Sequence, residues 1–141
     1  MLAILSTVVL VAVNPLRQFA QARNSEREAH VNTLLNAVGQ RIADNRGVFE
    51  GPGCDPLPYP AETIASTGFD LRSCLVTDYL SEIPLDPTLG TNDCVDEACT
   101  EGGYMATYSI ERSPATNRIT ICAPNHAETA IPNSTEFCLT R

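Results

Sequence analysis

The chain has 141 residues, with nine Lys and Arg against 17 Asp and Glu and a formal net charge of −8. All nine cationic residues are arginines. Residues 1–47 carry five of them against three acids, a net of +2, whereas residues 48–141 carry four against 14 acids, a net of −10. The C-terminal part is therefore strongly acidic and repels polyanions, which argues against nucleic-acid binding through a broad basic patch.

The N-terminal run Met1–Val13 (MLAILSTVVLVAV) is uncharged and mostly aliphatic. A soluble domain rarely begins with a bare apolar helix, so we expect this end to be buried in a membrane or among copies of itself. Spanning a bilayer takes about 20 residues, so the run is too short to span alone. A secretory signal peptide is an alternative, because residues 20–22 (AQA) resemble a cleavage site, but no Lys or Arg precedes the apolar run.

An amphipathic helix is predicted from Leu16 to about Arg46. Pro15 should break or kink the helix, since proline lacks a backbone N–H and clashes with the preceding turn. Gly47 is expected just past the helix end, where Arg46 would complement the helix dipole. If residues 1–46 are otherwise helical, they form a rod of about 70 Å, longer than one small head requires. The apolar positions at helical spacing are Leu16, Phe19, Val31, Leu34, Leu35, Val38 and Ile42, with Arg17, Arg23, Glu26, Arg27, Glu28, Asn32, Asn36 and Arg41 mostly on other faces.

Residues 48–103 are predicted to be mainly loop. Residues 48–60 are rich in Pro and Gly, which favours a loop. A short helix is expected over residues 61–67, and a brief helical or extended segment over 75–80. Residues 86–103 are predicted to form a long acidic loop, and loops of this length are often functional or mobile.

Strands are predicted in the C-terminal part, residues 104–141. Apolar residues alternate over 104–110 and again at Ile119 and Ile121, and the segment 113–117 (SPATN) between them predicts the turn of a β-hairpin. A third strand is expected around 136–140, with Phe137 and Leu139 on one face and Cys138 on the other. The amphipathic helix would cover this small sheet, so the predicted fold class is α+β.

Six cysteines lie outside the helix, and an even count in a small exported domain indicates disulfides, although six cysteines allow 15 pairings. We predict nearest-neighbour pairs, because these close three separate loops. Zinc is disfavoured, because the x4 spacing of the middle pair is not that of a zinc knuckle and no histidine is near. Covalent haem is disfavoured because there is no C-x-x-C-H motif. The predicted pairs are Cys54–Cys74, Cys94–Cys99 and Cys122–Cys138.

A resemblance to a known family rests on two stretches. Residues 1–47 combine an apolar helix half, a helix-breaking proline and an amphipathic half, and residues 79–87 read YLSEIPLDP. Over nearly its full length, the chain resembles bacterial type IV pilins and pseudopilins. It departs from the family in lacking the prepilin peptidase site, the N-terminal phenylalanine and the early glutamate. The alignment implies that roughly ten more apolar residues would precede Met1, giving a run of spanning length.

The resemblance implies a structural role as the repeating subunit of a type IV pilus-like filament. Its domains would be a filament-core or anchor helix (1–47) and a disulfide-stapled head (48–141). The subunit would wait in the inner membrane, and an assembly ATPase with its platform proteins would move it into a cell-surface homopolymer. Adhesion, motility or DNA uptake could follow, and the sequence does not choose among them. The expected filament interface is Leu2, Ile4, Leu5, Val8, Val9, Leu10, Val11, Val13, Pro15, Leu16 and Phe19.

Two other functions are weighed beside the filament. One is a pseudopilin of a type II-like secretion system, with Ca²⁺ as a weak candidate ligand in the acidic loop; the other is a membrane-tethered periplasmic binding domain that does not polymerise. The calcium candidates are Asp86, Asp93, Asp96 and Glu97, which supply the oxygen ligands that Ca²⁺ prefers but not the spacing of the twelve-residue calcium motif.

Catalytic chemistry is not expected. His30 is predicted to be a solvated or interface residue of the helix, and His126 lies in the predicted loop 124–133. No serine- or cysteine-based catalytic arrangement is indicated, and there is no glycine-rich phosphate loop. The sequon Asn133-Ser134-Thr135 makes Asn133 a candidate for glycosylation.

Overall fold

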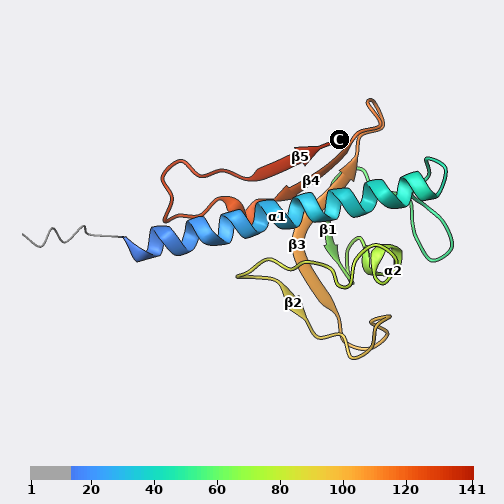
Figure 1. Ribbon diagram of the computed structural model, residues 1–141, viewed down its shortest axis with the longest axis horizontal. Coiled ribbons are helices and arrows are strands. Elements are labelled where there is room, and N and C mark those ends of the chain that lie inside the picture. The colour runs from blue at the N-terminus through green and yellow to red at the C-terminus, as the bar shows by residue number, and fades with distance from the viewer. Residues whose placement is uncertain (1–13) are drawn as a thin grey trace, which may run out of the picture.

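The computed structural model describes residues 14–141. Helix α1 (Pro15–Asp44) lies along the long axis of the molecule (Figure 1). Its 30 residues give a length of about 45 Å. Asn14 caps the helix, because its side-chain oxygen accepts a hydrogen bond from the Arg17 amide at 3.3 Å. Pro15 occupies the first helical position, where its missing N–H is not needed. The predicted break therefore coincides with the start of α1, while the run Met1–Val13 lies outside the described residues.

The C-terminal end of α1 differs in one residue from the prediction. Asn45 is the C-cap, and Arg46 follows it with a left-handed φ of 61°. The Gly47 amide then donates to the Ile42 carbonyl at 2.7 Å, which is the six-residue bond of a Schellman motif. The left-handed position that usually holds glycine is thus occupied by Arg46, while Gly47 comes one residue later.

An antiparallel sheet packs against α1, with strand order β1-β3-β4-β5 and β2 pairing with β3. β3 is the long strand of the sheet. Its partners are β1 along Met105–Ile110, β2 at its start and β4 at its end. The strands are β1 (Glu62–Ala65), β2 (Thr91–Asn92), β3 (Tyr104–Arg112), β4 (Ile119–Ala123) and β5 (Phe137–Thr140), and the short helices are α2 (Arg72–Leu75) and the 3-10 turn η1 (Pro124–His126). A long helix covering an antiparallel sheet makes the fold α+β.

The predicted hairpin and third strand are confirmed. β3 and β4 pair through the turn at 113–118, and the alternate residues of β3 are buried as the pattern requires. β5 pairs with β4, with Phe137 and Leu139 partly buried and Cys138 exposed. The amphipathic pattern of α1 is confirmed in its C-terminal half, where the aliphatic face joins the inner faces of β3 and β4 in one core. That core includes Val31, Leu34, Leu35, Val38, Tyr104, Ala106, Tyr108, Ile110, Ile119, Ile121 and Ala123.

Two local predictions are wrong, and a third, the acidic loop, is incomplete. Within the segment 61–67, residues Glu62–Ala65 form strand β1 and not a helix, because pairing with β3 suits the β-branched residues Thr63 and Ile64. The sequence also predicted a brief helical or extended segment over residues 75–80. The short helix in this region is α2, which ends at Leu75, the residue where that segment was expected to begin. The acidic loop 86–103 contains β2, whose two residues add to the start of β3.

Three disulfides tie the loops to this frame. They join Cys54–Cys74, Cys94–Cys99 and Cys122–Cys138, the pairs expected from the sequence. The first fixes the loop that follows α1 to α2. Arg41 of α1 reinforces this corner by donating to the carbonyls of Phe49 at 2.8 Å and Cys74 at 2.9 Å.

Replacing Arg46 by glycine should stabilise the protein. Glycine adopts a left-handed φ without the steric cost that a Cβ imposes, so Arg46→Gly should raise the free energy of unfolding by about 0.5–1 kcal/mol. Urea denaturation measures this. The control is Arg118→Gly, where φ is not left-handed, so added freedom of the unfolded chain should lower stability. A loss of stability in Arg46→Gly would show that the Arg46 side chain outweighs the backbone effect.

Candidate functional site

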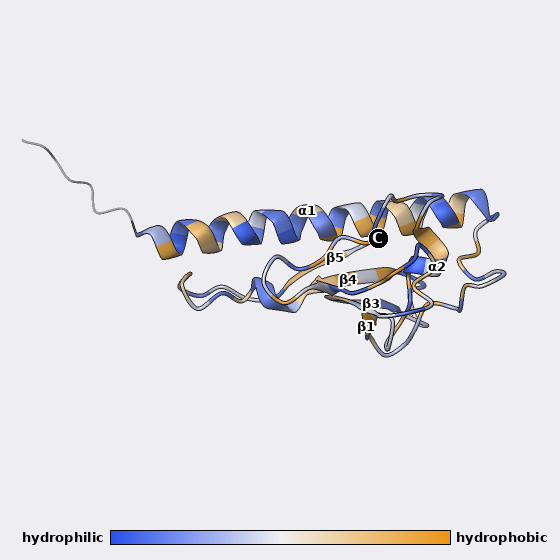
Figure 2. Ribbon diagram, turned by 90° about the horizontal axis from the view of Figure 1, so that it is seen from below, coloured by the Kyte–Doolittle hydropathy of each residue, from blue (hydrophilic) through white to orange (hydrophobic). Residues whose placement is uncertain are grey.

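The first turn of α1 presents an exposed apolar surface. Leu16 is 70% exposed and Phe19 64% exposed, and their i, i+3 spacing places them on the same side of the helix. The next residue on the helix, Ala20, is fully buried. Figure 2 shows α1 beginning beyond the end of the sheet. Of the expected filament interface, the structure therefore describes Pro15, Leu16 and Phe19, and all three are exposed; the eight residues from Leu2 to Val13 lie outside the described residues.

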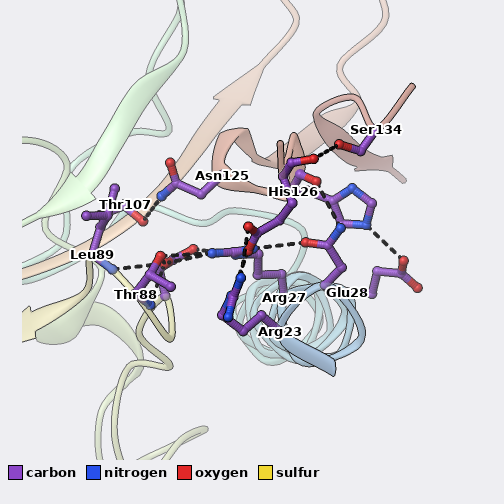
Figure 3. A network of polar contacts seen from close by, with 12 residues as sticks. Arg23, Arg27, Glu28, Thr88, Leu89, Thr107, Asn125, His126 and Ser134 are labelled. Atoms are coloured by element: carbon purple, nitrogen blue, oxygen red, sulfur yellow. Dashed lines mark hydrogen bonds and ion pairs between the residues drawn. The ribbon is translucent and has the colours of Figure 1, made fainter. Parts of the chain in front are cut away.

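A buried arginine lies two turns further along the helix. The Arg27 side chain is 1% exposed, and each of its five N–H donors has an acceptor (Figure 3). Its Nε donates to Asp86 at 2.7 Å, and its two terminal nitrogens reach Asn24, Glu128, Thr88 and the second Asp86 oxygen at 2.6–3.3 Å. We call the set Arg23, Asn24, Arg27, Asp86, Thr88 and Glu128 the polar network.

Asp86 is the buried counter-ion of Arg27. Besides the guanidinium, its carboxylate accepts from the Thr88 hydroxyl at 2.7 Å and from the backbone amides of Thr88 at 2.9 Å and Leu89 at 3.0 Å. Burial by itself would raise the pKa of Asp86, but the hydrogen bonds from Arg27, Thr88 and Leu89 hold it well below its usual range. Asp86 is therefore ionised in the folded protein at neutral pH.

Glu128 joins the network from the loop that precedes β5. Arg23 donates to it twice, at 2.7 and 3.0 Å, and Arg27 donates once at 2.6 Å. The hydrogen bonds from Arg23, and then from Arg27, outweigh the effect of burial and lower the pKa of Glu128 to about 2. Asn24 completes the contact with this part of the chain by donating to the His126 carbonyl at 2.9 Å. The network thus fixes the N-terminal half of α1 to both the 86–89 turn and the 124–136 segment.

The two histidines flank this network. His126 lies with one ring nitrogen 3.0 Å from Glu28 and the other 2.9 Å from the Thr135 carbonyl. His30 was expected to be solvated or at an interface, but its Nδ1 lies 2.8 Å from the Tyr108 hydroxyl, and burial lowers its pKa. Burial also raises the pKa of Tyr108, so the pair is neutral near pH 7.

The expectation that the arginines of α1 lie on its outer faces fails at Arg27. Its position at i+4 from Arg23 and i−4 from Val31 places it on the buried stripe, and this spacing was the available signal. The sequence could not show that Asp86 and Glu128, 59 and 101 residues away, would meet it. Buried polar atoms are fully paired here, since no buried side-chain nitrogen or oxygen of residues 14–141 lacks a hydrogen-bond partner.

The calcium candidates are not brought together. Asp86 is committed to Arg27, and the Asp96 carboxylate accepts hydrogen bonds from the amide and hydroxyl of Thr100. Within residues 14–141, the one group of three potential ligands within 4.8 Å is Cys122, Glu136 and Cys138, whose two sulfurs already form a disulfide. The sequon residue Asn133 is exposed and has a left-handed φ of 58°.

No family model, curated protein or solved structure matched this chain when it was compared with each. Among residues 14–141, no helix combines the length and hydropathy that crossing a membrane requires.

Neutralising Asp86 should strongly destabilise the protein. Asp86→Asn leaves the Arg27 charge buried without its main counter-ion, and breaking a buried pair in this way costs about 3–5 kcal/mol. Chemical denaturation of Asp86→Asn beside Asp93→Asn, the same change on an exposed loop, measures the difference. We expect the control to lie within about 0.5 kcal/mol of the unsubstituted protein. Equal stabilities of the two variants would contradict a buried ion pair.

The network also predicts acid sensitivity. Because the pKa of Glu128 is lowered to about 2, the ionised carboxylate stabilises the fold fully above about pH 5, and this stabilisation is lost as pH falls toward 2. In Glu128→Gln, the loss of stability between about pH 5 and 2 should be smaller by on the order of 2 kcal/mol. Thermal unfolding across this range tests it, with Glu136→Gln on the exposed side of the same segment as control. An unchanged pH slope in Glu128→Gln would refute the assignment.

Proposed function

We propose that this protein is the structural subunit of a type IV pilus-like filament, in which the N-terminal helix mediates polymerisation and the acidic head faces solvent. The observation that carries the proposal is the exposed apolar first turn of α1. Leu16 and Phe19, one i, i+3 step apart on either side of Arg17, extend apolar side chains beyond the aliphatic run Met1–Val13 into the described helix. An apolar surface of this kind calls for a partner, and copies of the same helix provide one of matching chemistry.

The attachment of α1 to the head supports this role. A subunit that is held by its helix must pass force from the helix to the head. The aliphatic core fixes the C-terminal half of α1 to the sheet, and the polar network fixes its N-terminal half to two further segments. The helix is thereby joined to the head over most of its length, with the first turn left free for contacts with neighbours.

The disulfides agree with an exported head. Three bonds in 128 described residues are typical of proteins that fold outside the reducing cytoplasm. The surface charge of the head, with a net of −10 over residues 48–141, favours solubility of an exposed filament surface. Calcium-dependent function of a pseudopilin finds less support, because Asp86 is engaged by Arg27.

Electron microscopy of cells that carry an assembly machine of the type IV class tests the proposal. The full chain should appear as long thin filaments in sheared surface material, with mass spectrometry identifying it as their main component. Phe19→Glu would bury a charge in the apolar interface at a cost of several kcal/mol. Since about 1.4 kcal/mol is tenfold in an association constant, filament yield should fall by more than about tenfold.

The matched control is Leu89→Glu, which introduces the same charge at an exposed leucine of the head. We expect filament yield to be close to that of the unsubstituted chain. Retention of the unsubstituted chain in the membrane fraction without filaments would overturn the proposal. Equal yields from Phe19→Glu and the unsubstituted chain would show that α1 does not form the interface in this way.

A further inference from the structure

An apolar groove lies beside the C-terminal half of α1. It has a volume of about 510 Å³, enough for more than one side chain, and it opens between α1 and the end of the sheet where Ile119 of β4 and Arg141 lie. Its apolar lining comes from both elements, with Gly39 leaving space on the helix side. Polar side chains from α1 line one part of it. We call it the α1 groove; its lining residues are Leu35, Asn36, Gly39, Gln40, Ile42, Ala43, Ile119 and Arg141.

The most exposed large hydrophobic residue in the described part of the chain is Val95, at 77%. It lies in the segment 93–101, which we call the Val95 loop. The Cys94–Cys99 disulfide closes this loop, the Val95 amide donates to the Glu101 carbonyl at 3.2 Å, and Asp96 accepts from the Thr100 amide at 2.7 Å. The loop is thus ordered before any contact, so that docking it would cost little conformational entropy.

The charges of the loop and the groove are opposite in sign. The Val95 loop carries four acidic side chains and no basic one: Asp93, Asp96, Glu97 and Glu101. The groove has Arg141 in its lining, and the exposed Arg118 directly precedes the groove residue Ile119. An apolar side chain flanked by acids therefore matches an apolar groove flanked by arginines, which favours a specific orientation of contact.

The two features lie at opposite ends of β3. The Val95 loop begins after Asn92, which pairs with Tyr104 at the start of the strand, whereas Ile119 of the groove pairs with Arg112 at its end. Eight residue steps at about 3.3 Å each separate these ends by roughly 25 Å. In Figure 1, the β2–β3 connection and the C-terminus lie on opposite sides of α1. One molecule therefore cannot fill its own groove.

We propose that the Val95 loop of one copy docks in the α1 groove of the next copy, with Val95 entering the groove and the flanking acids facing Arg118 and Arg141. The contact uses two different surfaces of the same molecule, so it is head-to-tail and extends into a fibre when its rotation does not close a ring. The inference rests on the proposed function, to which it adds a second interface between heads, distinct from the helix contacts at Phe19.

Photo-cross-linking in filaments of the full chain tests this contact. Val95 is replaced by an apolar amino acid that bears a diazirine, and the cross-linked residues are located by mass spectrometry. We expect cross-links from position 95 to the segments around Gly39–Ala43 or Ile119 of another copy. The same probe at exposed Leu89 is the control and should mark these segments at least fivefold less often.

Two outcomes separate this inference from the proposed function. Filaments whose position-95 cross-links fall outside the groove segments overturn the contact between the Val95 loop and the α1 groove, and leave the filament proposal intact. Absence of filaments from the unsubstituted chain overturns both. A second test requires no probe. Val95→Asp should lower filament yield at least fivefold, whereas the control Leu89→Asp should not. Equal yields for these two variants would also overturn the contact.

Discussion

The arrangement of the head along its helix depends on one buried charge. A guanidinium removed from water is strongly unfavourable unless every donor is paired, and Arg27 meets this requirement with acceptors from three separate parts of the chain. Asp86 and Thr88 come from one turn, Glu128 from the segment before β5, and Asn24 from the helix itself. Because a guanidinium is planar and its donors have fixed directions, small shifts of either segment would leave donors unpaired. The charge therefore specifies where these segments lie more strictly than apolar contacts would.

This requirement divides α1 into parts with different chemistry. The C-terminal half contributes Val31, Leu34, Leu35 and Val38 to an aliphatic core shared with β3 and β4. The middle part contributes the polar network. The first turn, with Leu16 and Phe19, contributes to neither and is exposed. One helix can thus be anchored to a small head along most of its length and still offer an apolar surface at the end that follows Met1–Val13.

The proposed contacts between copies use two separate regions: the first turn of α1 and the two ends of β3. Leu16 and Phe19 place apolar side chains next to the aliphatic N-terminal run, while the Val95 loop and the α1 groove lie at opposite ends of β3. The first contact would be driven by burial of apolar area, and the second by a smaller apolar insertion oriented by opposite charges. Disulfides and internal hydrogen bonds hold the Val95 loop in shape, which is the kind of order that a repeated contact requires.

The sequence by itself determined the elements whose signal is local. The structure confirms the predictions that rest on neighbouring residues: the helical spacing of α1, the alternation in β3 and β4, and the turn between these strands. Cysteines close in sequence also gave the three pairs that the structure shows. Only the tertiary structure decided that Glu62–Ala65 is a strand, because its partner β3 begins about 40 residues later. It also decided how Arg27 and Asp86 are used. From the sequence, Arg27 was expected on an outer face of the helix and Asp86 among calcium ligands. In the structure both are buried, and because an unpaired buried charge is strongly unfavourable, each requires the other as its counter-ion.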